Sequence, residues 1–243
     1  MTDTGGPVFS RETTSPTWHP GAFHEFDKPY LVLPPSQGTE AWHNDRLGKV
    51  TASNLHKVLC RTKTGYGAER GHYMTQLVLE RITGQRAESY TNAAMQWGID
   101  QEPFARAAYE AAKGVMVEEV GFIQHPTIDA SGASPDGLVG DDGLVEIKCP
   151  ESKTMLEACL AKANLVSPVE GKYYAQMQWQ MACTDRSWCD YVVYDPRMPA
   201  KAQLLVIRVN RDDEFIANAE TEVRKFLAEV DEKVSALRAI IGE

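Results

Sequence analysis

The order of helical and extended patterns along the chain predicts an α/β (α+β) fold, with a mixed central β-sheet flanked by helices. Helical patterns dominate from about residue 39 to residue 113, and short extended runs bounded by turn residues follow them. A long amphipathic helix then closes the chain. With 243 residues, of which 43% are hydrophobic and 24% charged, the chain can form one such domain with a full core.

The expected helices are recognised by their ends as much as by their apolar spacing. Ser53 is a good N-cap for a helix that runs to about residue 59. Gly84 and Gly114 stop the two longer helices that precede them, since glycine readily adopts the left-handed conformation that ends a helix. The predicted helices cover residues 39–45, 54–59, 72–83, 93–113, 151–162, 172–184 and 213–241.

The expected strands lie between these helices. Residues 115–124 alternate well enough for a strand, and residues 188–194 and 203–209 look like paired strands. Residues 137–140 and 144–149 flank Asp141-Asp142-Gly143, which we interpret as a three-residue hairpin turn with Gly143 in the left-handed conformation. The stretch from residue 61 to 71 reads as a basic, glycine-containing loop.

The first 36 residues differ in composition from the rest of the chain. They are rich in Pro, Gly, Ser and Thr, so we expect a loosely ordered N-terminal arm, followed by a single domain over residues 37–243. The beginning lacks the basic start and apolar stretch of a secretory signal. No apolar run reaches the roughly 18 residues that a membrane span needs.

Cysteine usage and net charge limit where the protein works and what it binds. Five cysteines without a CxxC pair indicate a reducing compartment, so we expect a cytoplasmic protein. The formal net charge of −9 argues against a broad nucleic-acid surface, because phosphate binding depends on Lys and Arg. A DNA-binding site must therefore be local, and carboxylates clustered around a metal are compatible with the acidic total.

The residues with the clearest chemical pattern are Asp136, Glu146 and Lys148. Glu146 and Lys148 share one face of their strand because side chains alternate along a strand. A three-residue turn pairs Leu138 with Glu146 and Asp136 with Lys148, which brings all three polar groups to that face. A two-residue turn would put Asp136 on the opposite face, so the chemistry requires the longer turn.

Two carboxylates at one point are hard oxygen ligands suited to Mg²⁺, and the backbone carbonyl of Ile147 is a further candidate ligand. Bound metal polarises a scissile phosphate and lowers the pKa of a water, which Lys148 could position. The alternative is a surface hairpin with scattered charges, since a bare match to this spacing occurs often by chance. The apolar neighbours of Glu146 and Lys148 favour the site, because charges within a buried strand need a reason.

Two of these segments, residues 133–137 (Ala-Ser-Pro-Asp-Gly) and 146–150 (Glu-Ile-Lys-Cys-Pro), resemble the PD-(D/E)xK nucleases. More narrowly, the chain resembles the phage lambda exonuclease family, also called the YqaJ-like viral recombinases. The likeness extends over roughly residues 37 to 240 and implies a PD-(D/E)xK nuclease core. The other matching segments, in chain order, are residues 41–43 with 46–48, 51–53, 97–98 with Glu102, Tyr173 with 175–176, and 194–198.

The resemblance implies roles for residues that the pattern alone would not single out. Glu102 matches an acidic residue that supports the metal site, although a solvated helix face is the alternative. Arg46, Ser53 and Ser134 match residues that hold the 5′-phosphate of a DNA end. An Arg fork and a helix N-terminus both suit a phosphate. Gln176 matches a polar residue near the catalytic centre, and an ordinary amide on a helix face explains it equally well.

Four further residues are candidate DNA contacts by the same resemblance. Met95 matches an apolar wedge that helps to unpair the terminal bases, although a Met before a Trp is more often a core residue. The family's best-known member has a lysine two residues earlier, where this chain has Ala93, so we expect a DNA contact there to be missing or replaced. Arg61 and Lys63 lie in the loop that approaches DNA, and Tyr173 is open to the same two interpretations as Gln176.

The resemblance implies a Mg²⁺-dependent 5′→3′ exonuclease, with Mn²⁺ as an alternative ion, that degrades one strand of linear double-stranded DNA. The 3′ overhang would serve phage-type homologous recombination by strand annealing in the cytoplasm of a bacterial host. A homotrimeric ring and a single-strand annealing recombinase partner are also implied. Two alternatives stay open: a site- or structure-specific endonuclease of the same superfamily, and a non-catalytic DNA-end-binding module.

Overall fold

The computed structural model describes residues 35–87 and 92–242. The predicted N-terminal arm therefore lies almost entirely outside the described residues. Within them, no helix is both long and apolar enough to cross a membrane.

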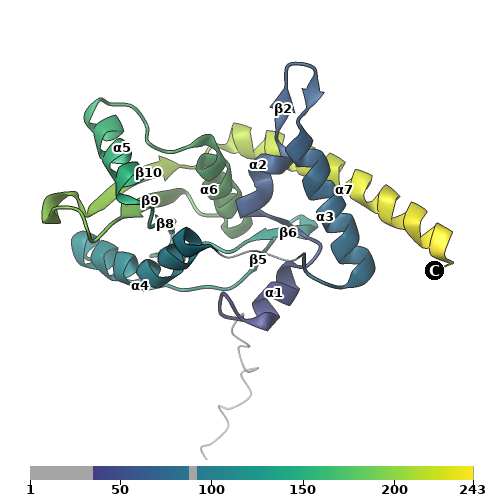
Figure 1. The fold of residues 1–243 in the computed structure, drawn as a ribbon, viewed down its shortest axis with the longest axis horizontal. Coiled ribbons are helices and arrows are strands. Elements are labelled where there is room, and N and C mark those ends of the chain that lie inside the picture. The colour runs from purple at the N-terminus through teal and green to yellow at the C-terminus, as the bar shows by residue number, and fades with distance from the viewer. Residues whose placement is uncertain (1–34, 88–91, 243) are drawn as a thin grey trace, which may run out of the picture. The chain divides into compact units, whose positions relative to one another are not determined.

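A mixed five-stranded sheet forms the centre of the fold, with the strand order β10-β9-β8-β7-β4 (Figure 1). Only β8 and β9 are parallel, and the other neighbours are antiparallel. The predicted mixed sheet is thereby confirmed. Its strands are β4 (Val117–Glu118), β7 (Gly137–Val139), β8 (Gly143–Lys148), β9 (Trp188–Tyr194) and β10 (Leu204–Asn210).

Two smaller sheets lie outside this centre. One contains β1 (Val50–Thr51), β6 (Ile128–Ala133) and β5 (Ile123–His125), and the other is a hairpin of β2 (Arg61–Thr62) and β3 (Gly65–Tyr66). The single strand predicted over residues 115–124 is wrong, because β4 and β5 belong to different sheets. Strand β6 was not predicted, and the predicted loop over 61–71 contains the hairpin.

The helices follow the predicted order with small changes in length. Gly84 and Gly114 both adopt left-handed conformations and end their helices as expected, with φ of 64° and 67°. Ser53 is not an N-cap, because it lies inside the short 3-10 helix η1. The helices are α1 (Glu40–Arg46), η1 (Ala52–Asn54), α2 (Leu55–Val58), α3 (Ala68–Thr83), α4 (Ala93–Lys113), α5 (Ser152–Ala163), α6 (Gly171–Thr184), η2 (Ala200–Ala202) and α7 (Asp213–Ile241).

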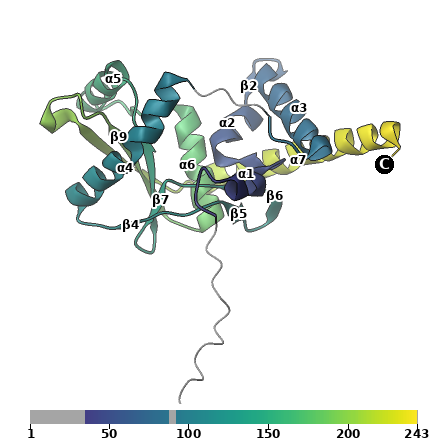
Figure 2. The same ribbon diagram turned by 60° about the horizontal axis from the view of Figure 1, so that its bottom comes forward.

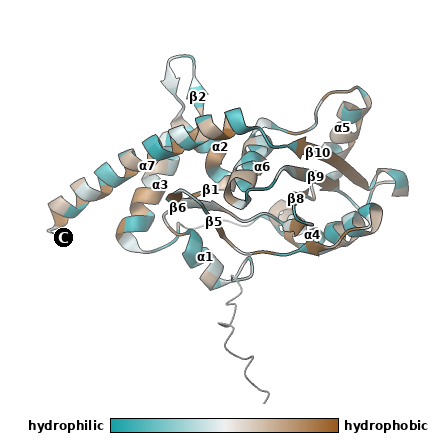
Figure 3. Cartoon of the chain, turned by 180° about the vertical axis from the view of Figure 1, so that it is seen from behind, coloured by the Kyte–Doolittle hydropathy of each residue, from teal (hydrophilic) through white to brown (hydrophobic). Residues whose placement is uncertain are grey.

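Helices cover both faces of the central sheet. On one face α4 packs against alternate residues of the strands, including Val145 and Ile147 of β8. On the other face α5 and α6 pack against the intervening residues, beginning with Leu144. Strand β9 is buried over most of its length, in keeping with this double cover, and the edge strand β10 is largely hydrophobic in Figure 3.

Helix α6 also connects the central sheet to the remaining helices. Its Trp179 belongs to a core shared with α2, α3 and α7. Apolar and polar residues alternate along α7 in Figure 3, and its last turns extend beyond α3 in Figures 1 and 2. Helix α6 therefore has one side facing β8 and another facing the helical layer.

The turn between β7 and β8 has the predicted length but a different register. Residues 140–142 form the turn, so Val139 faces Gly143 and Leu138 faces Leu144. The left-handed residue is Gly140, with φ of 54°, and not Gly143. At Gly143 a Cβ atom would approach the Trp188 ring to 2.1 Å, so this glycine is needed for close packing. Each residue of β7 thus pairs two positions earlier in β8 than expected. Because side chains alternate between the two faces, a shift of two residues leaves Asp136 on the same face as Glu146.

Candidate active site

Glu146 is a fully buried carboxylate in the middle of β8. Its Oε1 atom accepts a hydrogen bond from Gln176 Nε2 at 2.7 Å, and its Oε2 atom accepts one from Gln180 Nε2 at 2.6 Å. Lys148 Nζ forms an ion pair with Oε1. Both glutamines come from one face of α6, where residues four apart are neighbours. These donors compensate the burial of a charged group inside the fold.

Asp136 lies directly before β7, and its side chain contacts the backbone of β8. Its Oδ2 atom accepts the backbone N–H of Ile147 at 2.7 Å. Burial and the neighbouring Glu146 carboxylate raise the pKa of Asp136 well above its ordinary value, while Lys148 acts in the opposite direction. The structure thus brings the three residues of the predicted constellation together.

Lys148 is the cation of this cluster. Burial lowers its pKa, but Glu146 and Asp136 outweigh burial and raise the pKa above its ordinary value. Lys148 therefore stays protonated at neutral pH and can stabilise negative charge, whereas it is a poor general base. The Tyr173 ring lies beside it, with its centroid 5.1 Å from Nζ.

Glu102 lies on α4 at the edge of the cluster. Arg106 donates a hydrogen bond to its Oε1 atom at 2.7 Å. Burial raises the pKa of Glu102, the Arg106 and Lys148 cations lower it, and the Glu146 carboxylate raises it. Glu102 is therefore a half-buried carboxylate paired with Arg106, and its support of the metal site stays a prediction.

A second polar group lies two residues before Asp136. Ser134 Oγ accepts hydrogen bonds from Trp42 Nε1 at 2.9 Å and from an Arg46 guanidinium nitrogen at 3.0 Å. The guanidinium also stacks over the Trp42 ring, 4.2 Å from its centroid. Both donors come from α1, which buries none of its own residues. Arg46 and Ser134, predicted as one group, are thus in direct contact.

Arg46 has no carboxylate partner within the described residues, and burial lowers its pKa to about 10. It remains charged at neutral pH. Together with Met95, Arg46 lines a cavity of about 580 Å³ whose wall also carries Lys49, Lys57 and Thr51. A cation without a counter-ion beside such a cavity is suited to bind an anion.

The other phosphate and DNA candidates are more dispersed. Ser53 Oγ lies 3.3 Å from Thr51 Oγ1 and has no contact with Arg46 among the hydrogen bonds of the described residues. Arg61 pairs with Glu222 of α7 at 2.7 Å, whereas Lys63 is exposed at the tip of the β2–β3 hairpin. The hairpin residues are thus in a different part of the fold from the carboxylate cluster.

The sequence interpretation missed Gln180 and gave Trp42 no role of its own. Gln180 follows Gln176 by four residues, so helical spacing alone would have put both amides on one face. The Ser134 contact of Trp42 depends on the path of α1, for which the sequence contains no comparable signal.

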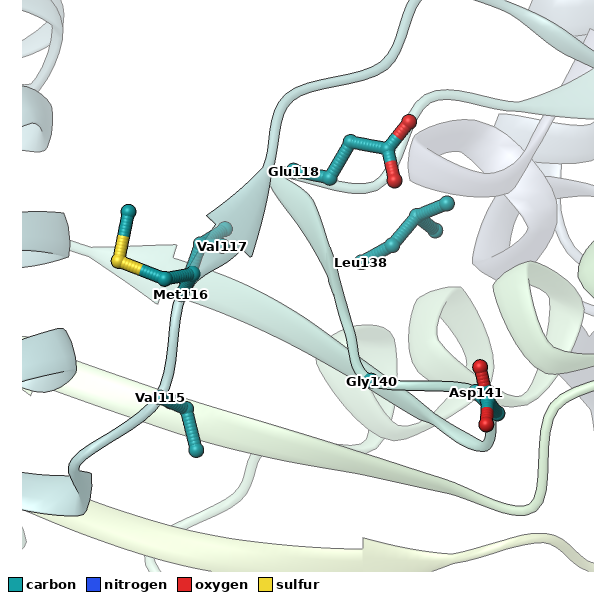
Figure 4. Close-up of a pocket in the computed structure, with 7 residues that line it drawn as sticks. All are labelled: Val115, Met116, Val117, Glu118, Leu138, Gly140 and Asp141. Carbon is teal, nitrogen blue, oxygen red and sulfur yellow. The ribbon is translucent and has the colours of Figure 1, made fainter. Parts of the chain in front are cut away.

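A further cavity, of about 540 Å³, lies at the edge of the central sheet (Figure 4). Its lining comes from the segment around β4 and from the β7–β8 turn, and Glu118 and Asp141 are its only charged residues. None of the predicted site residues belongs to it.

The donor set around Asp136 and Glu146 fits a hard divalent cation. Burial and the neighbouring Glu146 carboxylate both raise the pKa of Asp136, and a bound cation would favour the charged form of both carboxylates. No group of three or more His, Cys, Asp and Glu residues within the described ranges could hold a metal ion. Mg²⁺ nevertheless keeps several waters and needs only one or two carboxylates.

Comparisons with known proteins show the family to which the chain belongs. The family described as the YqaJ-like viral recombinase domain matches residues 41–187. The alkaline exonuclease LHK-Exo from Laribacter hongkongensis is 48% identical, with a TM-score of 0.76 over 84% of this chain and 98% of that chain. The crystal structure of LHK-Exo in complex with dAMP matches over the same shares with a TM-score of 0.77.

Two more distant proteins are also similar. A phage related exonuclease from Haemophilus somnus 129PT shares the fold, with a TM-score of 0.63 at 16% identity over 78% of this chain and 96% of that chain. The protein ExoD of Escherichia coli (strain K12) is 27% identical over 75 residues, which are 31% of this chain and 85% of ExoD.

Proposed function

Because the chain belongs to the YqaJ-like viral recombinase family, as its sequence motifs predicted, we propose that it is a DNA exonuclease. The observation that carries the proposal is the convergence of Asp136, Glu146 and Lys148 in a chain 48% identical to an alkaline exonuclease. Fold likeness alone would not carry it, since one fold serves many activities.

The proposed cofactor is Mg²⁺, with Mn²⁺ as a substitute, held by Asp136, Glu146 and the backbone carbonyl of Ile147. When bound, such an ion polarises the scissile phosphate and lowers the pKa of a water. The protonated Lys148 stabilises the negative charge that develops on the phosphate oxygens. Glu102, whose pKa is raised, is suited to hold a water or a proton at the edge of the cluster.

The proposed substrate is the 5′ end of a linear duplex, from which one strand is degraded 5′→3′ to leave a 3′ overhang. Support comes from the Arg46 cation, which has no carboxylate partner in the described part of the chain and which with Ser134 and Ser53 is proposed to bind the terminal phosphate. Met95 lines the same cavity as Arg46 and is half exposed, as a wedge against terminal bases must be.

Further DNA contacts are proposed for Tyr173, Lys63 and Arg61. Tyr173 adjoins Lys148, and Lys63 is solvent-exposed. Arg61 would first exchange its Glu222 partner for a phosphate.

The remaining proposals concern the biological setting. We propose a homotrimeric ring of a phage or prophage protein, working with a single-strand annealing recombinase in the cytoplasm of a bacterial host. Residues 37–243 are proposed as the nuclease domain, with the preceding residues as an arm. A ring would offset the net charge of −9, because enclosure retains DNA without a strongly basic surface.

The test is digestion of linear and closed circular duplexes, with and without a 5′-phosphate, in Mg²⁺ or Ca²⁺. An exonuclease releases nucleotides from the linear duplex in Mg²⁺ and leaves the circle intact. Cleavage of the circle would instead identify an endonuclease. DNA binding without metal-dependent product release would identify a non-catalytic end-binding module.

A further inference from the structure

Gln180 is a second amide at the carboxylate cluster beside Gln176, and neither the sequence motifs nor the proposed mechanism uses it. The residue is fully buried on α6, and its Nε2 atom lies 2.6 Å from Oε2 of Glu146. Reversing the amide would put its oxygen against an ionised carboxylate. The contact therefore fixes Nε2 as the atom that faces Glu146.

The Nε2 end of this amide offsets the burial of Glu146, but the Oε1 end adds no stability of its own. Gln180 Oε1 is buried and has no hydrogen-bond partner among the described residues. A buried acceptor without a donor destabilises a fold, and an apolar side chain of similar size would avoid that loss. The side-chain hydrogen bond that Gln180 does make is to a single atom of the cluster, Glu146 Oε2.

The hydrogen bonds around Glu146 can be counted against what its carboxylate accepts. An ionised carboxylate offers about four lone-pair positions, two on each oxygen. Gln176 Nε2 and Lys148 Nζ both lie at Oε1, whereas Gln180 Nε2 is the only donor at Oε2 among the described residues. One position on Oε2 is thus left for a further partner.

We propose that Gln180 is a positioning residue that holds the Glu146 carboxylate in the rotation at which Oε2 receives a divalent cation. This inference rests on the proposed metal-dependent function. Groups that hydrogen-bond to a metal-ligating carboxylate typically change metal affinity ten- to a hundredfold when they are removed. Gln180 fits that description because it bonds Oε2, the oxygen on which a lone-pair position is left among the described residues.

The experiment replaces Gln180 by the near-isosteric methionine and measures Mn²⁺ binding by titration calorimetry on the full-length protein. We expect Gln180→Met to bind Mn²⁺ about ten- to a hundredfold more weakly than the unaltered protein. Nucleotide release should then need a correspondingly higher Mn²⁺ concentration, with a smaller change in the rate at saturation.

The matched control is Gln178→Met. Gln178 is equally buried on the same helix, but its amide donates to the Asn210 carbonyl and accepts the Asp212 backbone N–H, away from Glu146. This variant should lower the melting temperature and leave Mn²⁺ affinity unchanged. If Gln178→Met weakens Mn²⁺ binding as much as Gln180→Met does, a general loss of packing explains both and the proposal is overturned.

A second measurement needs no variant, in case Gln180→Met does not fold. In Mn²⁺-soaked crystals of the unaltered protein, the anomalous peak should lie within coordination distance of Glu146 Oε2, with the Gln180 contact intact. A cation on Oε1 that displaces Gln176 or Lys148 would overturn the proposal.

The outcomes also separate this inference from the proposed function. If the unaltered protein neither binds Mn²⁺ nor releases nucleotides, the proposed function fails. If it does both, and Gln180→Met binds Mn²⁺ within about threefold of it, only the positioning role fails, because removal of a true supporting group costs more than that.

Discussion

Replacing Arg46 by alanine tests whether the cation beside Ser134 recognises the end of the DNA. A guanidinium has five N–H donors, and in the structure Ser134 Oγ accepts from one of its nitrogens. The remaining donors face no carboxylate of the described residues. If they bind a 5′-phosphate, Arg46→Ala should abolish a contact that a 5′-hydroxyl end never makes.

The expected magnitude follows from the type of contact. A hydrogen bond between charged groups contributes about 1.5–3 kcal/mol, and about 1.4 kcal/mol corresponds to tenfold in an equilibrium. The preference for phosphorylated over hydroxyl ends should therefore fall by about ten- to a hundredfold in Arg46→Ala. Arg46→Lys keeps the charge but loses the planar fork, so it should retain an intermediate preference.

The assay compares initial rates on two linear duplexes that differ only in the 5′ group, at DNA concentrations below saturation. Arg224→Ala is the control, because Arg224 is exposed and only bonds Thr127. Circular dichroism should show that both variants are folded. A folded Arg46→Ala protein with an unchanged preference would refute the assignment of Arg46 to the phosphate site.

Three other predictions follow from the site and the core. Glu146→Gln and Lys148→Met should each lower the rate of nucleotide release by roughly a thousandfold or more, and activity within about tenfold of the unaltered protein would contradict this. In the unaltered protein, Ca²⁺ should bind without supporting cleavage. Burial lowers the pKa of His125 from 6.5 despite the opposing Glu220. The folded state therefore favours the neutral ring, so the melting temperature should fall as the pH drops below about 6.5. The fall should be less steep in His125→Gln, and equal slopes in the two proteins would contradict the role of His125. Sedimentation should give a mass of about three times 27.0 kDa. Digestion of DNA that is already bound should continue after competitor DNA is added as a trap, and a monomer that digests processively would exclude the ring as the cause of processivity.

The central hairpin shows what a sequence can predict about this site. Alternation in a strand puts Glu146 and Lys148 on one face, and the odd length of the turn puts Asp136 on the same side. Both inferences depend on parity alone, so the two-residue error in register did not affect them. The register could not be predicted in the same way. It places Gly143 against Trp188, which lies in a strand 45 positions later in the chain.

Other errors have the same origin in distant contacts. Strand β6 carries a Ser, a Gly and two Ala residues, a composition with little strand propensity, and it forms because β1 and β5 pair with it. Ser53 resembles an N-cap by local rules, but η1 begins before it. Gln180 is indistinguishable by spacing from any amide on an amphipathic helix until the strand that it faces is known.

Helix α1 has a consequence for how this protein can change. It contributes Trp42 and Arg46 to Ser134 yet adds no fully buried residue to the core, so substitutions at its exposed positions should cost little folding stability. If Arg46 and Ser134 bind the terminal phosphate as proposed, exchanging residues 40–46 with those of a relative should change the preference for the DNA end and leave the cluster on β8 untouched. End preference could then evolve separately from the residues proposed to cut the strand.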